Sequence, residues 1–301
     1  MTLGKISHLI HMTGDLAALD AWYDDVFGVK RGWMDNDFLD MELRDASLLT
    51  VGDIVIETVA PSFHVDGWDS YPLGRFYNRF GDHWHSISWY ADETMSHWKK
   101  LHDNNIRILG SAGAKADTLP RYDAPLFTHP RDTIAQLEIE PPCDFADADP
   151  RQQSGYDPLW WVNNHPLGLY GLSYTTVLTD DLEKAKKVFV DLLDGDLLEE
   201  SSSKLTGTDD IYVKVGDAVI QASRPIREDT IAADDFRSSG EIHHAACFRV
   251  ADLDKAEIYL ESKGIRTVAR DEHTVLSDPR TTHGAVFRWT DRLIPGGTYT
   301  S

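Results

Sequence analysis

Histidine and glutamate side chains occur inside segments that otherwise read as buried β-strands. Glu57 interrupts the apolar run DIVIETV, and strand alternation places it on the opposite face from Ile56. His83 and His85 are two residues apart, so in a strand they share one face. Imidazole nitrogens and carboxylate oxygens together suit Fe, Mn, Co, Ni or Zn. These residue types therefore indicate metal chemistry wherever the fold brings them together.

A short repeat indicates how the chain arranges its elements. Residues 52–57 read GDIVIE and residues 216–221 read GDAVIQ, and a proline follows each copy at the same distance. Upstream of each copy lie a β-like segment and an amphipathic helix, over residues 6–28 and 172–195. Each helix opens with an Asp-Leu pair, whose aspartate can cap the exposed N–H groups of the first turn. The two stretches therefore predict the same strand–helix–strands module.

A second pair of repeats interleaves with the first. Residues 85–106 match residues 244–265, and Asn105 stands at the helix-ending position that Gly264 occupies in the other copy. The turns THPRDT and SDPRTT then lead into final strands that read AQLEIE and AVFRW. The chain thus reads as four modules, two in each half.

The length and the repeats together predict the domain organisation. The 301 residues are enough for two domains of ordinary size. Turn-forming residues and a change of charge separate the halves. We predict a first domain over residues 1–145, a linker over 146–167 and a second domain over 168–301.

Composition limits the partners. The chain carries 29 basic and 50 acidic side chains, a formal net charge of -21, which repels phosphate backbones and anionic lipid headgroups. Cys143 and Cys247 form no metal-binding spacing, which indicates reduced thiols in a reducing compartment. The N-terminus shows no signal peptide, and no segment reaches the roughly 18 apolar residues of a membrane span. We therefore expect a cytoplasmic protein with a small-molecule substrate and neither nucleic acid nor membrane as partner. The oligomeric state stays open, a homo-oligomer included.

The module pattern resembles the vicinal oxygen chelate superfamily, which includes glyoxalases, bleomycin resistance proteins and extradiol dioxygenases. The resemblance rests on a strand beginning with His, a helix opened by Asp-Leu, and strands ending in a GDxVIE-like segment. It implies an α+β fold of four βαβββ modules, arranged as two tandem glyoxalase-like domains. In that superfamily two modules form a cupped sheet, and the cup holds one divalent metal ion.

The resemblance also implies where the ligands of this metal lie. In family members the ligands come from the first and last strands of each module. The corresponding residues of the first half are His8, Glu57, His85 and Glu138. Aligning Glu138 requires a one-residue gap, so Glu140 on the same strand face remains an alternative. Two imidazoles and two carboxylates bind a divalent ion well and leave positions open for substrate oxygens.

The second half differs at the same positions. They hold Tyr174, Gln221, His244 and Arg288, with His243 adjacent to His244. Arg288 is a permanent cation and repels a metal ion. The second site is therefore interpreted as degenerate, and this half as structural or as a lid.

These features leave three functions open. The leading interpretation is a metal-dependent lyase or isomerase that moves a proton next to a carbonyl or enediolate of a small substrate, which could be aromatic. By similarity to glyoxalase-like enzymes, Glu138 is the base.

The first alternative is an Fe(II) ring-cleaving dioxygenase that uses a triad of two histidines and one glutamate. In the comparable dioxygenases that triad lies in the second half, where Tyr174 and Arg288 stand here. The second alternative is a metal-free, resistance-type binding protein.

Overall fold

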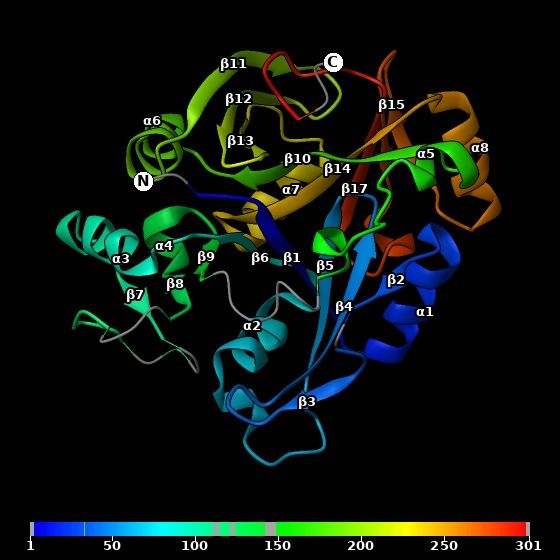
Figure 1. The fold of residues 1–301 in the computed structure, drawn as a ribbon. Helices are drawn as coiled ribbons and strands as arrows, with labels where there is room; N and C mark the ends of the chain where they lie inside the picture. Colours follow the sequence, from blue (N-terminus) through cyan, green and yellow to red (C-terminus); the bar gives the residue numbers. More distant parts are fainter. Residues whose placement is uncertain are drawn as a thin grey trace.

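The computed structural model describes residues 3–32, 34–110, 113, 115–120, 124–141 and 149–298. Each half of the chain forms one mixed β-sheet (Figure 1). In the first sheet the strand order is β2-β4-β5-β1-β6-β9-β8-β7, with β3 paired to β4. Its strands are β1 (Ile6–Met12), β2 (Lys30–Arg31), β3 (Asp37–Leu39), β4 (Arg44–Val51), β5 (Ile54–Pro61), β6 (His83–Tyr90), β7 (Ile108–Leu109), β8 (Leu126–Thr128) and β9 (Gln136–Glu140).

The second sheet repeats this order. It runs β11-β12-β13-β10-β14-β17-β16-β15, so each strand has a counterpart in the first sheet. Its strands are β10 (Leu169–Leu178), β11 (Asp196–Ser203), β12 (Thr208–Val215), β13 (Ala218–Pro225), β14 (Ile242–Val250), β15 (Thr267–Arg270), β16 (Thr274–Ser277) and β17 (Val286–Thr290). The predicted α+β fold with two tandem halves is therefore confirmed.

Strand register repeats as closely as strand order. Ile10 on β1 pairs with Glu57 on β5, and in the other half Thr176 on β10 pairs with Gln221 on β13. The segments GDIVIE and GDAVIQ thus occupy the same turn and strand of their sheets. The alignment of Glu57 with Gln221 follows from backbone pairing as well as from sequence.

Register also shows which glutamate of β9 corresponds to Arg288. Ser88 on β6 pairs with Glu138, and Cys247 on β14 pairs with Arg288. Ser88 and Cys247 each lie three residues after the first histidine of the matched segments. Glu138 therefore corresponds to Arg288, and the one-residue gap in the alignment is correct. Glu140 lies two residues further along the same strand.

Helix ends that the sequence analysis identified are found in the structure. Asp15 accepts a hydrogen bond from the Ala18 amide at the start of α1, and Asp181 caps the start of α6. Asn105 and Gly264 both adopt positive φ angles, of 61° and 78°, at the ends of their helices. The main helices are α1 (Leu16–Phe27), α2 (Pro72–Phe80), α3 (Thr94–Asp103), α6 (Leu182–Lys186, continued by a π-helical turn to Leu192), α7 (Ile231–Ser239) and α8 (Leu253–Ser262). Two shorter helices are α4 (Pro130–Thr133) and α5 (Trp160–Asn164). In the described part of the chain, no helix combines the length and apolar character that crossing a membrane requires.

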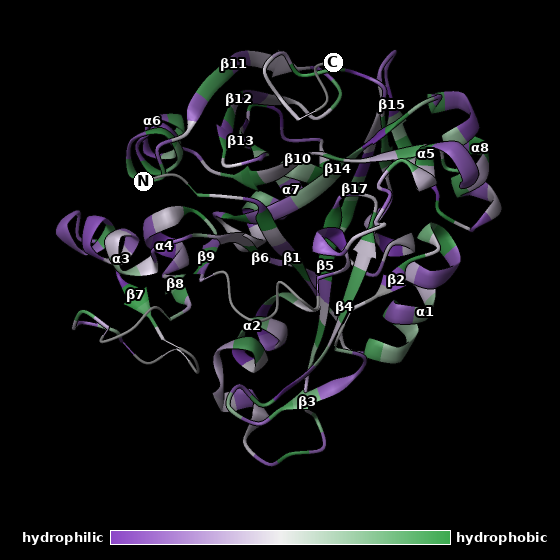
Figure 2. Cartoon of the chain, viewed as in Figure 1, coloured by the Kyte–Doolittle hydropathy of each residue, from purple (hydrophilic) through white to green (hydrophobic). Residues whose placement is uncertain are grey.

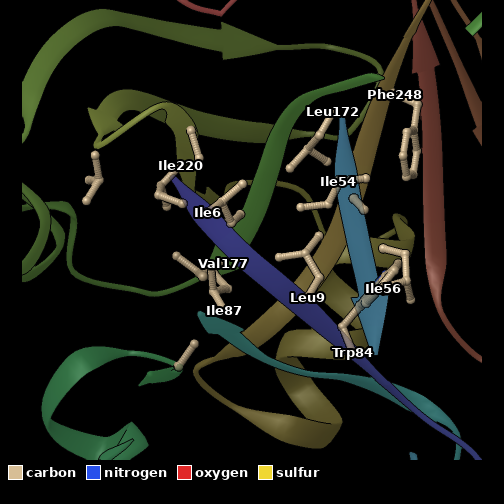
Figure 3. Close-up of a cluster of buried hydrophobic side chains, with 14 of the residues drawn as sticks. Ile6, Leu9, Ile54, Ile56, Trp84, Ile87, Leu172, Val177, Ile220 and Phe248 are labelled. Carbon is tan, nitrogen blue, oxygen red and sulfur yellow. The ribbon is translucent and has the colours of Figure 1, made fainter. Parts of the chain in front are cut away.

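The hydrophobic core lies between the two sheets. Figure 3 shows Leu9 of β1 near Val177 of β10 in one cluster of buried side chains. Trp84 and Trp89 of β6 are fully buried there, and each donates its indole N–H to a carbonyl of the second half. Figure 2 shows hydrophilic stretches on the peripheral helices α3 and α8.

The repeated Gly-Asp turns lock the halves together. Asp53 accepts a hydrogen bond from the Leu172 amide at 2.8 Å, and Asp217 accepts one from the Ile6 amide at 2.7 Å. Gly216 has a φ of 62°, and an added Cβ would lie 2.1 Å from the Gly4 carbonyl oxygen. Each turn therefore holds the first strand of the opposite half, and the repeat keeps its glycine because the other half approaches so closely.

The described part of the predicted linker, from Asp149 onward, packs against the first half. Arg151 donates hydrogen bonds to the carbonyls of Ile6 and Ser7, and Trp161 is fully buried with its N–H on the Phe27 carbonyl. The predicted boundary at 145–146 and Cys143 lie outside the described residues. The boundaries 1–145, 146–167 and 168–301 therefore stay predictions.

Candidate metal centre

Four neighbouring strands of the first sheet bring the predicted ligands into one cavity. His8 comes from β1, Glu57 from β5, His85 from β6 and Glu138 from β9, and all four line a cavity of about 250 Å³. None of them is more than 8% exposed. Burying two imidazoles and two carboxylates costs free energy unless they are paired or bind a ligand. We call this space the first cavity.

His8 lies among carboxylates. Its Nε2 atom is 3.2 Å from Glu57 Oε2, 3.5 Å from Glu138 Oε2 and 3.8 Å from Glu140 Oε1. This buried nitrogen nevertheless makes no hydrogen bond of acceptable geometry. Burial alone would lower the pKa of His8, but the carboxylates of Glu140, Glu57 and Glu138 outweigh burial and raise it to about 9. In the absence of another cation, His8 therefore carries a proton at neutral pH.

His85 is neutral, whereas His8 is protonated. Burial lowers the pKa of His85 to about 4 despite the nearby carboxylates, so the ring is neutral at pH 7. Its Nδ1 lies 3.0 Å from Ser86 Oγ, and Phe76 packs edge-on against the ring. A neutral imidazole with one nitrogen occupied by a hydrogen bond is the form that ligates a metal through the other nitrogen.

Glu138 and Glu140 both face His8, so the two alternatives of the sequence analysis lie in one cluster. The ligand atoms of His8, Glu138 and Glu140 all lie within 4.8 Å of one another. Burial opposes ionisation of Glu138, but His8 and other donors lower its pKa to about 2. Burial raises the pKa of Glu140, whose oxygens accept from Ser88 and Ser7.

Arg44 on β4 is the residue that sequence reasoning missed. Its guanidinium contacts Glu57 through Nη1 and lies 2.6 Å from Glu42 through Nε. Arg44 is therefore buried beside the predicted ligands and neutralises part of their charge. In the segment RDASLLTV, strand alternation places Arg44 and Leu48 on the same face, and the sequence shows this much. Only the pairing of β4 with β5 shows that this face also carries Glu57.

The cluster fits a divalent cation by its donors and its charge. Four carboxylates line the first cavity near its ligands, at Glu42, Glu57, Glu138 and Glu140, whereas the nearby cations are Arg44 and protonated His8. A divalent ion replacing the His8 proton would supply the missing positive charge and a partner for His8 Nε2. His8, Glu138 and Glu140 would hold it directly, with Glu57 and His85 beside them.

Apolar side chains form the rest of the first cavity. The polar cluster covers the surface formed by β1, β5, β6 and β9, and the surrounding walls include Ile10, Met34, Leu48, Leu73, Leu109 and Phe127. A small apolar space with a few convergent polar groups is the usual form of a small-molecule site.

The second sheet places a cation where the first places a carboxylate. Arg288 Nη1 donates to Gln221 Oε1 at 2.8 Å, and Gln221 in turn donates to the Tyr212 hydroxyl. Tyr174, at the position of His8, packs edge-on against Tyr212. In this half Gln221 and Arg288 form a hydrogen-bonded network with Tyr212, and a guanidinium at the centre does not suit a metal.

The two adjacent histidines of β14 face opposite sides of the sheet. His244 lines a separate cavity, and its Nδ1 lies 2.5 Å from Asp235 of α7. His243 bonds to Thr175 and faces the core between the sheets. Asp235 also contacts His83 of the first half at 3.2 Å, which accounts for the second histidine on β6. Despite burial, these two histidines lower the pKa of Asp235 far below its usual range.

Comparison with known proteins shows the fold. No family model and no curated protein sequence matches the chain. Among solved structures, a mutant of 4-hydroxymandelate synthase from Streptomyces coelicolor superposes with a TM-score of 0.69. It is 13% identical and covers 95% of this chain and 92% of the synthase. Methylmalonyl-CoA epimerase from Mycobacterium tuberculosis is 24% identical over 40% of this chain and 87% of its own, with a TM-score of 0.38. The synthase comparison establishes a shared architecture over nearly the whole chain.

Proposed function

We propose that this chain, which has the vicinal oxygen chelate fold, is a divalent-metal-dependent lyase or isomerase that works through its first cavity. The observation that carries the proposal is His8 Nε2, a buried nitrogen without a hydrogen bond that faces three carboxylates. The apolar walls around it suit a small substrate with an aromatic or aliphatic body.

A divalent ion held by His8, Glu138 and Glu140 would act as a Lewis acid on a substrate carbonyl or enediolate oxygen. Glu138 takes the proton from the neighbouring carbon. Glu138 would be the displaceable ligand: Gln136 donates to its Oε1, and Oε2, the oxygen nearest His8, would hold the ion until the carboxylate takes the proton. Arg44 holds Glu57 in place, and the apolar walls exclude water from the reacting carbon. Glu140, on the same strand face, is the alternative base.

The test combines elemental analysis with proton exchange. Purified protein is expected to contain about one divalent ion per chain. Small hydroxy-carbonyl compounds in D₂O should then lose the signal of the C–H next to the carbonyl, and chelation should stop the exchange. Metal without exchange on any compound of such a panel would argue against the proton-transfer reaction.

A second function has one specific observation in its favour. His8, His85 and Glu138 are two histidines and one carboxylate in an apolar cavity that also contains Phe127 and Tyr90. This combination suits Fe(II) and an aromatic substrate. Oxygen uptake on a catechol, lost after oxidation in air, would favour the ring-cleaving dioxygenase. Protein purified with no metal, and unable to take one up, would favour the resistance-type binder.

A further inference from the structure

The second half contains a cavity of its own. It has a volume of about 470 Å³ and lies over the face of the second sheet that carries His244 and Arg288. Both side chains are only 1% exposed, so they form its floor. The sides include Leu205, Ile231 and Leu276, and the charged side chains at the mouth are Lys204, Arg227, Asp229, Arg270 and Asp271. We call this space the second cavity.

Arg288 at its floor is a buried cation without an acidic partner. Its Nη1 donates to Gln221 and Thr176, both neutral side chains. Its Nε makes no hydrogen bond, and among the described residues no carboxylate lies within the 4.0 Å of an ion pair with it. Asp210 acts on it only at longer range. Burying an unpaired guanidinium is costly in free energy, so its retention in this acidic chain calls for a compensating anion.

The surroundings define what kind of anion fits. Arg227 and Arg270 at the mouth form ion pairs with Asp229 and with Asp254, and Lys204 is exposed to solvent, so Arg288 is the buried cation of the cavity and has no acidic contact. The apolar sides then favour an organic body over a fully hydrated inorganic ion. A planar guanidinium also matches the geometry of a carboxylate.

His244 completes the floor in a fixed orientation. Asp235 holds its Nδ1 at 2.5 Å, so the ring cannot turn to meet Arg288 through that nitrogen. Asp235 is itself fixed by His83 and Ser239. The floor therefore presents a rigid imidazole edge beside the guanidinium, which favours a ligand of defined shape.

We propose that the second cavity binds a small carboxylate with an apolar body, and that Arg288 receives the carboxylate. The second half is then a ligand-binding module in its own right. This proposal is independent of the reaction in the first cavity, because none of its residues belongs to that site.

Calorimetric titration with benzoate and benzamide tests the proposal, because the two probes share shape and differ in charge. The whole chain should bind benzoate and should bind benzamide roughly 10- to 100-fold more weakly, the range that charged hydrogen bonds contribute. Arg288→Met should lose benzoate binding by the same factor. Arg224→Met is the matched control, since Arg224 lies in the same half, is exposed and pairs with Asp209 away from the cavity.

Two further variants keep the test decisive if Arg288→Met does not fold. Ala269 lines the second cavity and is half-buried, so Ala269→Phe fills the space and should abolish benzoate binding while Arg288 stays in place. His8→Ala should bind benzoate normally, which separates this site from the first cavity. Equal binding of benzoate and benzamide, or benzoate binding lost in His8→Ala and kept in Ala269→Phe, would overturn the proposal. Binding of inorganic phosphate without benzoate would overturn the carboxylate assignment.

Discussion

The two sheets of this protein have the same strand order and equivalent register at the compared positions, but they place opposite charges at one corresponding pair, Glu138 and Arg288. His8, Glu57, His85 and Glu138 of the first half correspond to Tyr174, Gln221, His244 and Arg288 of the second. The first cavity has more buried carboxylates than cations, whereas the second has a buried guanidinium without an acidic contact. The comparison teaches that this fold fixes where side chains converge and leaves their chemistry to single substitutions.

An arginine in each half contacts the last residue of the repeated segment, GDIVIE or GDAVIQ. Arg44 contacts Glu57, and Arg288 contacts Gln221. The arginines come from different strands, β4 and β17, so they are not counterparts in the repeat. In the first half the arginine balances an excess of carboxylate, and in the second it is itself the excess charge.

The largest expected effect on activity comes from substituting Glu138, the position at which the second half has Arg288. Glu138→Gln should retain some metal, because an amide oxygen still coordinates. Turnover should fall by roughly two to four powers of ten, the usual contribution of a general base. His8→Ala should instead lose metal and activity together. The measurement is metal stoichiometry beside rate for each variant, and Glu140→Gln tests the alternative base on the same strand. A near-normal rate in Glu138→Gln would transfer the role of base to Glu140 or Glu57.

Removing each arginine should affect stability differently. In metal-free protein Arg44→Met leaves Glu57 and Glu42 without their guanidinium partner, which should cost about 3–5 kcal/mol. Arg288→Met removes a cation that has no acidic contact, so the free energy of unfolding should fall by only about 1 kcal/mol. Urea unfolding of both variants measures the difference. Equal losses would show that the two arginines balance charge in the same way.

Asp235 should make the stability of the second half depend on pH. The first half lacks this effect, because Phe76 and not a carboxylate packs against His85. The pKa of Asp235 is depressed in the folded state, so its contribution is present above the unfolded value of about 4 and is lost as pH falls below it. Asp235→Asn should cost about 1–3 kcal/mol at pH 7. The variant should also lose less stability than the wild type between about pH 5 and pH 3. Parallel stability–pH curves for the two proteins would contradict the role assigned to this carboxylate.

The smallest expected effect lies where the halves should behave alike. Asp53→Ala and Asp217→Ala each remove the hydrogen bond to the first strand of the opposite half, and Asp217→Ala also removes an exposed ion pair with Lys5. Each should cost about 0.5–1.5 kcal/mol. Thermal unfolding of the two single variants checks this equivalence. A loss of stability in one variant and none in the other would show that only one of the two turns stabilises the contact between the halves.

Sequence periodicity predicted the architecture because each module repeats its helix caps and turns. The caps at Asp15 and Asp181 are local signals, so they could be read directly. Arg44 could not be assigned to the site, because its contact with Glu57 depends on which face of β4 is buried. The contacts of Asp235 with His83 and His244 join segments up to 152 residues apart. Helices α2 and α7 were not predicted either, although Phe76 and Asp235 on them orient His85 and His244.

The candidate ligands show the same limit. The resemblance placed His8, Glu57, His85 and Glu138 on the first and last strands of two modules, and the structure brings them into one cavity. Glu140 joins the cluster because β9 directs both of its glutamates toward His8. That these side chains bind a metal stays a prediction, because the donors and charges of the cavity support it but do not test it.

The most direct test of the central claim is the metal content of a matched pair of histidine variants. Elemental analysis of the wild type, His8→Ala and His244→Ala should be done after identical purification. The metal hypothesis predicts about one divalent ion per chain in the wild type and in His244→Ala, and almost none in His8→Ala. Metal retained in His8→Ala and lost in His244→Ala would place the ion in the second half and contradict the proposed division between the halves.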